Sequence, residues 1–132
     1  MATTQEAVQI SNIVPTLTVD DLQKSIAFYE ALGFEIDERW EEKGTLLGVM
    51  LRAGRNQIGL NQDDWKKGRD RKKGQGVRVS ISTTPGAVDE IARRAKSAGI
   101  TLTSDPHDTE WKSRAFEVCD PSGYQLTIYS RT

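Results

Sequence analysis

Cysteine and histidine are almost absent from this 132-residue sequence, which contains one of each, Cys119 and His107. A single cysteine excludes a framework of intrachain disulfides. Structural zinc sites draw four ligands mainly from these two residue types, so one chain cannot build such a site in its usual composition. A site made of one histidine and carboxylates remains possible by count.

Long apolar runs and an excess of one charge are also missing. No run approaches the roughly 20 apolar residues of a membrane span, and the N-terminal stretch MATTQEAVQI lacks the basic and apolar parts of a signal peptide. Eighteen Lys and Arg against nineteen Asp and Glu give a formal net charge of −1, which argues against a protein held on nucleic acid by phosphate contacts alone. We expect one cytoplasmic domain, residues 1–132, with no membrane or nucleic-acid partner.

The first half of the chain predicts one helix among four strands. Alternating apolar and polar residues predict strands, and the stretch DDLQKSIAFYEALGF predicts a helix that Asp20 caps, with Gln23 at capping-box spacing and Gly33 at its end. The predicted strands are residues 13–19, 34–40, 45–54 and 56–62.

The second half repeats this order after a basic, glycine-containing segment, residues 63–75, which we interpret as a solvated linker. Thr84 is the expected cap and Pro85 the expected first turn of a second helix, which ends at Gly99. Strands are predicted at residues 77–82, 100–104, 114–120 and 124–130. An equal order in both halves indicates a duplication, with module one at about 10–62 and module two at about 76–130.

Two stretches of sequence carry a family resemblance. VDDLQKSIAFYEALGF resembles the first-helix signature of the vicinal oxygen chelate superfamily, and SAGITLTSDPHDTEW followed by RAFEVCDPSGYQLTIY is similar to its second-half signature. That superfamily includes glyoxalase I, extradiol dioxygenases, fosfomycin-resistance transferases and bleomycin-resistance proteins. The resemblance implies an α+β fold of two tandem βαβββ modules that form a curled, cup-like mixed sheet, and a homodimer.

Metal-dependent members of this superfamily place His, Glu or Gln at four strand positions. The resemblance maps these positions to Val14, Gly59 (or Asn61), Gly76 (or Arg78) and Thr127. None supplies a carboxylate or an imidazole, and a divalent ion needs three or four converging N or O ligands. We therefore expect no bound metal or other cofactor, and no glyoxalase or dioxygenase chemistry of the metal-dependent kind.

The same mapping sends the polar residues of four strands into the cup. This polar surface is either the wet face of an open sheet or a cavity that holds a small organic ligand, with Arg78 as its charged anchor. Tryptophans at strand ends (Trp40, Trp65, Trp111) and Arg114 can line the same cleft or simply close the core and its rim. The candidate ligand-binding residues are Thr16, Thr18, Gln57, Asn61, Trp65, Arg78, Ser80, Trp111, Arg114, Gln125, Thr127 and Tyr129.

Three further residues have side chains capable of chemistry. Alternation leaves the facing of Glu117 open, His107 is assigned to a loop, and Cys119 is expected to be a small buried residue rather than a nucleophile. The leading hypothesis is a metal-free protein that binds a small organic, anionic or aromatic ligand. The alternatives are a lyase, isomerase or dioxygenase-like enzyme with a diverged or displaced active site, and a dimeric interaction module.

Overall fold

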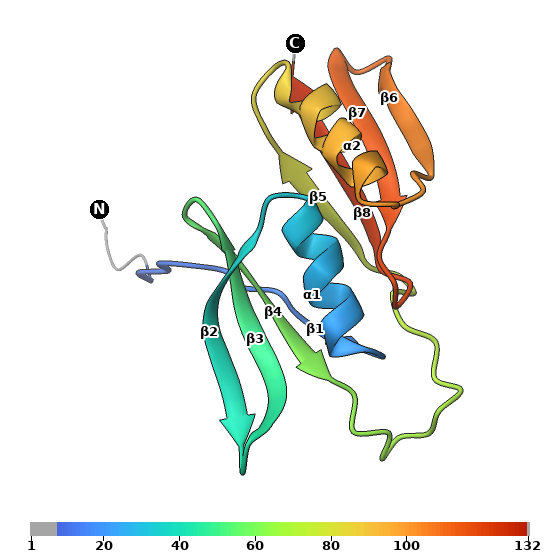
Figure 1. Ribbon diagram of the computed structural model, residues 1–132. Helices are drawn as coiled ribbons and strands as arrows, with labels where there is room; N and C mark the ends of the chain where they lie inside the picture. The colour runs from blue at the N-terminus through green and yellow to red at the C-terminus, as the bar shows by residue number, and fades with distance from the viewer. Residues whose placement is uncertain (1–7, 132) are drawn as a thin grey trace.

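The computed structural model describes residues 8–131, so most of the N-terminal stretch considered above lies outside the described residues. Its elements confirm two βαβββ modules in tandem (Figure 1). Module one contains β1 (Thr16–Val19), α1 (Leu22–Ala31), β2 (Glu35–Glu42), β3 (Thr45–Ala53) and β4 (Asn56–Gln62). Module two contains β5 (Arg78–Ser82), α2 (Ala87–Ser97), β6 (Ser104–Asp108), β7 (Ser113–Cys119) and β8 (Gln125–Arg131).

Each module forms its own four-stranded mixed sheet. Sheet A has the order β1-β4-β3-β2, and sheet B has the matching order β5-β8-β7-β6. The pairs β1–β4 and β5–β8 are parallel, and the remaining neighbours are antiparallel. Within residues 8–131, β1 and β5 each have one strand neighbour, so each leaves a backbone edge unpaired.

Alternation along the strands separates a buried face from a polar face in both sheets. In β8 the side chains of Leu126 and Ile128 are buried, whereas Gln125, Thr127 and Tyr129 are half-buried. The buried faces and the two helices form one hydrophobic cluster with members from both modules. Figure 1 shows α1 between the two sheets and α2 over sheet B. No helix among the described residues is long and apolar enough to cross a membrane.

Both helices begin later than the sequence predicts. The N-cap of α1 is Asp21, whose side chain accepts a hydrogen bond from the Lys24 amide at 3.2 Å. Asp20, the expected cap, instead donates its amide to Ser122 Oγ at 2.9 Å in module two. The N-cap of α2 is Gly86 with no side-chain cap, because Thr84 and Pro85 belong to the turn before it. Tertiary contacts and turn geometry thus displaced the predicted caps.

The sixth strand also lies later than predicted. Residues 100–102 have no strand pairing, and β6 runs over Ser104–Asp108, which places His107 in a strand opposite Ala115 rather than in a loop. The strand includes Pro106, which sequence reasoning counts against a strand. An edge strand tolerates this proline because one side of its backbone needs no partner, and β6 is the edge of sheet B.

The turn before β8 ties the two modules together. Asp120 is buried and accepts hydrogen bonds from Tyr29 Oη of α1 and from the amides of Ser122 and Tyr124, all at 2.9 Å. Tyr124 Oη in turn donates to the Thr18 carbonyl at 2.9 Å. Burial and the negative charge of Asp120 raise the pKa of Tyr29 above its ordinary value, so the phenol stays protonated and donates.

The segment between β4 and β5 is more than a solvated linker. Lys73, with a side chain only 3% exposed, lies between the carboxylates of Asp20 and Asp63, the latter at 2.8 Å. These hydrogen bonds outweigh burial and raise the pKa of Lys73, while the bond from Lys73 lowers the pKa of Asp63. A Cβ on Gly74 would lie 2.3 Å from the Gly123 carbonyl oxygen, so only glycine permits this approach to the Asp120 turn.

We expect Tyr29→Phe to lower the free energy of unfolding by about 1.5–3 kcal/mol, because it removes a buried hydrogen bond to a charged group. The matched control is Tyr129→Phe, whose hydroxyl bonds to no described residue and whose loss should change stability little. Urea unfolding monitored by circular dichroism measures both. Equal stabilities of the two variants would show that the Tyr29–Asp120 bond does not hold the modules together.

Candidate functional site

The polar face of sheet B is a grid of side chains from its four strands. Strand register places Ser80, Thr127, Glu117 and Ser104 in one row across the sheet. The row on one side of it holds Arg78, Gln125 and Cys119. The row on its other side holds Ser82, Tyr129, Ala115 and His107. The predicted residues Arg78, Ser80, Gln125, Thr127 and Tyr129 therefore do share one face.

Arg78 joins two of these rows. Its Nη1 donates to Thr127 Oγ1 at 2.9 Å and to Glu117 Oε2 at 3.1 Å. The side chain of Arg78 is 50% exposed and that of Glu117 is 39% exposed. This contact shows that Glu117 lies on the polar face of sheet B. Its neighbours Phe116 and Val118 are buried on the other face, and adjacent residues of a strand point to opposite faces, so alternation indicates the same facing.

The polar face of sheet A carries less charge near its centre and one large aromatic side chain. Register places Thr18, Asn61, Gly48 and Trp40 in one row, beside a row with Thr16 and Gly59. A Cβ on Gly48 would lie 2.7 Å from Trp40 Cε3 and from Asn61 Oδ1. The glycine thus lets the indole of Trp40 approach the sheet closely, which makes Trp40 part of this face.

Three predicted residues lie elsewhere. Arg114 faces the helix side of sheet B, where Nε and Nη2 donate to Asp89 of α2 and Nη1 donates to Asp108. Trp111 is 77% exposed in the turn before β7. Trp65 belongs to the segment between the modules, with the cationic groups of Arg69 and Lys73 at 4.8 and 4.9 Å from its ring centre. None of these contacts joins them to the two polar faces.

Cys119 and His107 belong to the polar face, contrary to expectation. Cys119 is exposed at the end of β7 rather than buried. Partial burial, followed by the negative charge of Asp120, raises the pKa of its thiol, so the thiol is not activated as a nucleophile. His107 Nδ1 lies 2.8 Å from the Asp105 carbonyl oxygen, in the row next to that of Glu117.

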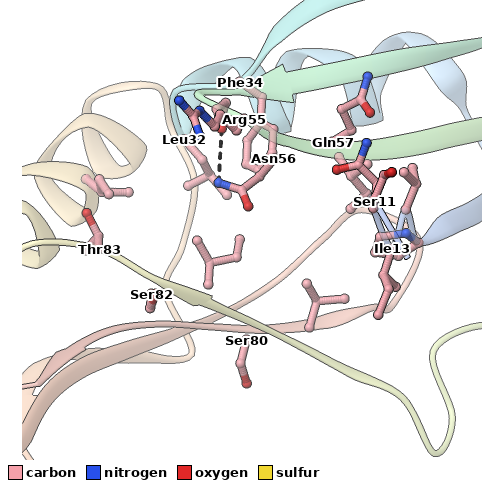
Figure 2. Close-up of a pocket in the computed structure, with 18 of the residues that line it drawn as sticks. Ser11, Ile13, Leu32, Phe34, Arg55, Asn56, Gln57, Ser80, Ser82 and Thr83 are labelled. Atoms are coloured by element: carbon pink, nitrogen blue, oxygen red, sulfur yellow. Dashed lines mark hydrogen bonds between the residues drawn. The ribbon is translucent and has the colours of Figure 1, made fainter. Parts of the chain in front are cut away.

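A cavity of about 770 Å³ lies where the two modules meet (Figure 2). Apolar side chains from both modules line it, among them Leu32 and Phe34 after α1 and Val79 and Ile81 of β5. Arg55, Asn56 and Gln57 from the β3–β4 turn and β4 add polar groups, and Asn56 Nδ2 donates to the Ala53 carbonyl at 3.3 Å. Gln57 also donates to Asp37 at 3.2 Å.

This cavity uses a different surface from the polar face. Of the predicted residues only Gln57 and Ser80 line it, and Figure 2 shows the Ser80 hydroxyl pointing away from its centre. The cavity depends on how the modules pack together, and local alternation carries no signal for that arrangement. Sequence reasoning therefore missed Leu32, Phe34 and Arg55.

The residues at the four positions to which the resemblance maps the metal ligands offer no carboxylate and no imidazole. The strand β5 begins at Arg78, so Gly76 lies before it; Arg78 is opposite Gln125 in register, and its side chain reaches Thr127. Val14 is apolar, Gly59 has no side chain, and the guanidinium of Arg78 puts a permanent positive charge 2.9 Å from the Thr127 hydroxyl. That charge repels a metal cation. Among residues 8–131 no three His, Cys, Asp or Glu side chains converge on a shared point.

Comparison with known proteins agrees with this architecture. A glutathione transferase, FosA, from Serratia marcescens is 24% identical over 115 residues, which cover 86% of this chain and 76% of that protein. The crystal structure of TioX from Micromonospora sp. ML1 has a TM-score of 0.74 at 20% identity, over 92% of this chain and 99% of that one. A superfamily member from Sphaerobacter thermophilus has a TM-score of 0.72 at 25% identity, over 93% and 98% of the two chains.

A family model covers almost the whole chain. Residues 9–128 match the model of the Glyoxalase/Bleomycin resistance protein/Dioxygenase superfamily. The match spans both modules, including the D-P-S-G turn (120–123) and the first part of β8. The chain therefore belongs to the Glyoxalase/Bleomycin resistance protein/Dioxygenase superfamily.

Proposed function

We propose that this protein binds a small organic ligand on the polar face of sheet B without a metal ion. The observation that carries the proposal is Arg78, a half-exposed guanidinium on the edge strand β5, on the same face as the amide of Gln125 and the hydroxyls of Ser80 and Thr127. Thr127 and Glu117 hold it in place through one nitrogen. A fixed cation beside hydroxyl and amide groups, with Glu117 on one side of it, suits the anionic group of a ligand.

The proposal includes a homodimer that covers this face. The two polar faces and the unpaired edges of β1 and β5 are open in the described chain. Unpaired edges invite pairing with another chain, and a twofold pairing would set sheet A of one copy against sheet B of the other. In this arrangement Trp40 supplies an aromatic wall opposite Arg78.

The ligand is to be found by screening carboxylates, phosphates and aromatic compounds for a raised melting temperature. For an anionic hit, we expect Arg78→Ala to weaken binding by roughly 10- to 150-fold, the equivalent of about 1.5–3 kcal/mol for a charge-assisted hydrogen bond. Titration calorimetry measures the change, and Thr127→Ala should have a smaller effect because it removes a neutral contact.

The matched control for Arg78→Ala is Arg93→Ala, which removes the same charge from a surface pair with Glu90 on α2. Both variants should remain folded, because exposed ion pairs contribute little stability. Equal affinity of the wild type and Arg78→Ala would show that Arg78 does not anchor the ligand. Turnover of the hit by the wild type would favour the enzyme alternative.

Metal content tests the metal-free part of the proposal. We expect the purified protein to carry no stoichiometric divalent ion, since the mapped positions offer one hydroxyl and a repelling guanidinium. Elemental analysis by mass spectrometry after gel filtration measures this directly. One equivalent of Zn, Ni, Mn or Fe per chain would contradict it.

The assembly state is a separate test. We expect light scattering to give twice the 14.7 kDa mass of the chain at micromolar concentration. Glu substituted for Thr16 or for Ser80 should weaken the dimer, since each adds a charge to an open polar face beside an unpaired edge. A monomer at micromolar concentration would overturn the dimer, and with it the covered binding face.

A further inference from the structure

Arg78 has hydrogen-bond donors that no described residue uses. A guanidinium carries five N–H groups, and Nη1 of Arg78 donates to Thr127 and Glu117. Among residues 8–131, no side chain or carbonyl accepts from its Nε or Nη2. These two nitrogens form the edge of the guanidinium that faces away from Nη1, and their parallel N–H bonds match the two oxygens of one carboxylate.

Arg114 shows how this chain fills such an edge when the role is structural. Its Nε and Nη2 donate to both oxygens of Asp89 at 2.8 and 2.9 Å, and Nη1 donates to Asp108 at 3.1 Å. Arg78, in the same sheet, has its Nη1 occupied and the corresponding edge open. The open edge is therefore a place for an oxyanion that comes from outside the chain.

Glu117 adds the opposite charge to the same site. Only Oε2 bonds to Arg78, and within the described chain Oε1 accepts no hydrogen bond. A carboxylate accepts and never donates when ionised, so it repels a second anion and attracts an ammonium or another cationic donor. For an anion that lacks such a donor, the attraction of Arg78 is partly cancelled by the repulsion of Glu117.

We propose that the ligand of this face is dipolar, with an anionic group on the Nε–Nη2 edge of Arg78 and a cationic donor on Glu117 Oε1. Glu117 lies at Nη1, on the far side of the guanidinium from that edge. The two charged ends of the ligand must therefore be several bonds apart, as in an ω-amino acid, rather than on one carbon, as in an α-amino acid. This inference rests on the proposed function and names the ligand class of that site.

The test uses two matched pairs of probes, 4-aminobutyrate with butyrate and glycine with acetate. Amide chemical shifts of β5 and β8 report binding at this face in an NMR titration of the full chain. We expect 4-aminobutyrate to bind roughly tenfold more tightly than butyrate, the size of one charge-assisted hydrogen bond. Glycine should bind no more tightly than acetate, because its ammonium cannot reach Glu117.

Substitution of Glu117 should change the affinities for 4-aminobutyrate and butyrate in opposite directions. Glu117→Gln removes the negative charge, so 4-aminobutyrate should bind roughly tenfold more weakly and butyrate should bind more tightly. Arg78→Ala should abolish the amide chemical-shift changes caused by either probe. The surface variant Arg93→Ala should leave both sets of changes as in the wild type. A merely structural role for Glu117 would move both affinities the same way.

Each outcome separates this inference from the proposed function. Equal binding of 4-aminobutyrate and butyrate, or unchanged affinities in Glu117→Gln, would overturn the dipolar ligand and leave an anion site at Arg78. Binding of both probes that survives in Arg78→Ala would overturn the site itself. Absence of shifts in β5 and β8 with all four probes at millimolar concentration would count against the proposed function and this inference together.

Discussion

The relation between the two modules depends on one buried carboxylate. Asp120 lies in the turn before β8, where Tyr29 of α1 and two turn amides satisfy its oxygens. An ionised carboxylate without these donors would be far too unfavourable inside the protein, so the turn and the helix must meet in this one way. The ion pairs of Lys73 with Asp20 and Asp63, and the close approach of Gly74 to Gly123, stabilise the same junction. The position of β8, and therefore of Thr127 at the middle of the polar face, follows from it.

The sequence was sufficient for most of what depends on local periodicity, although alternation placed the sixth strand too early, at residues 100–104. Alternation in β8 correctly separated Leu126 from Thr127, because one face of each sheet packs on helices and the other does not. It failed where a distant contact decided the outcome. Asp20 resembles a helix cap, yet its amide and carboxylate serve Ser122 and Lys73. Arg114, in contrast, shares the alternation of the buried residues Phe116 and Val118, so the pattern within β7 places it on the helix side, where Asp89 of α2 binds it.

The duplicated modules share a backbone plan but not a complete core. In β1 the helix-facing side chains of Leu17 and Val19 are buried, whereas their counterparts Val79 and Ile81 in β5 are half-buried beside the cavity. Close packing is normal for protein interiors, so the difference arises from how module one lies against β5 rather than from composition. This explains why the cavity could not be predicted: the residue types at these positions are those of an ordinary core.

The two polar faces differ in chemistry even though their strand orders match. Sheet B places a guanidinium and a carboxylate within one hydrogen-bonded cluster, in which Nη1 contacts both Thr127 and Glu117. Sheet A places the indole of Trp40 over Gly48, with threonines and an amide beside it, and Trp40 Nε1 donates to the Glu38 carboxylate at 3.1 Å. A rigid pair of opposite charges fixes the orientation of a ligand, whereas an aromatic surface contributes buried area with little orientation. A site built from both faces would therefore derive its selectivity from sheet B and much of its apolar contact from sheet A.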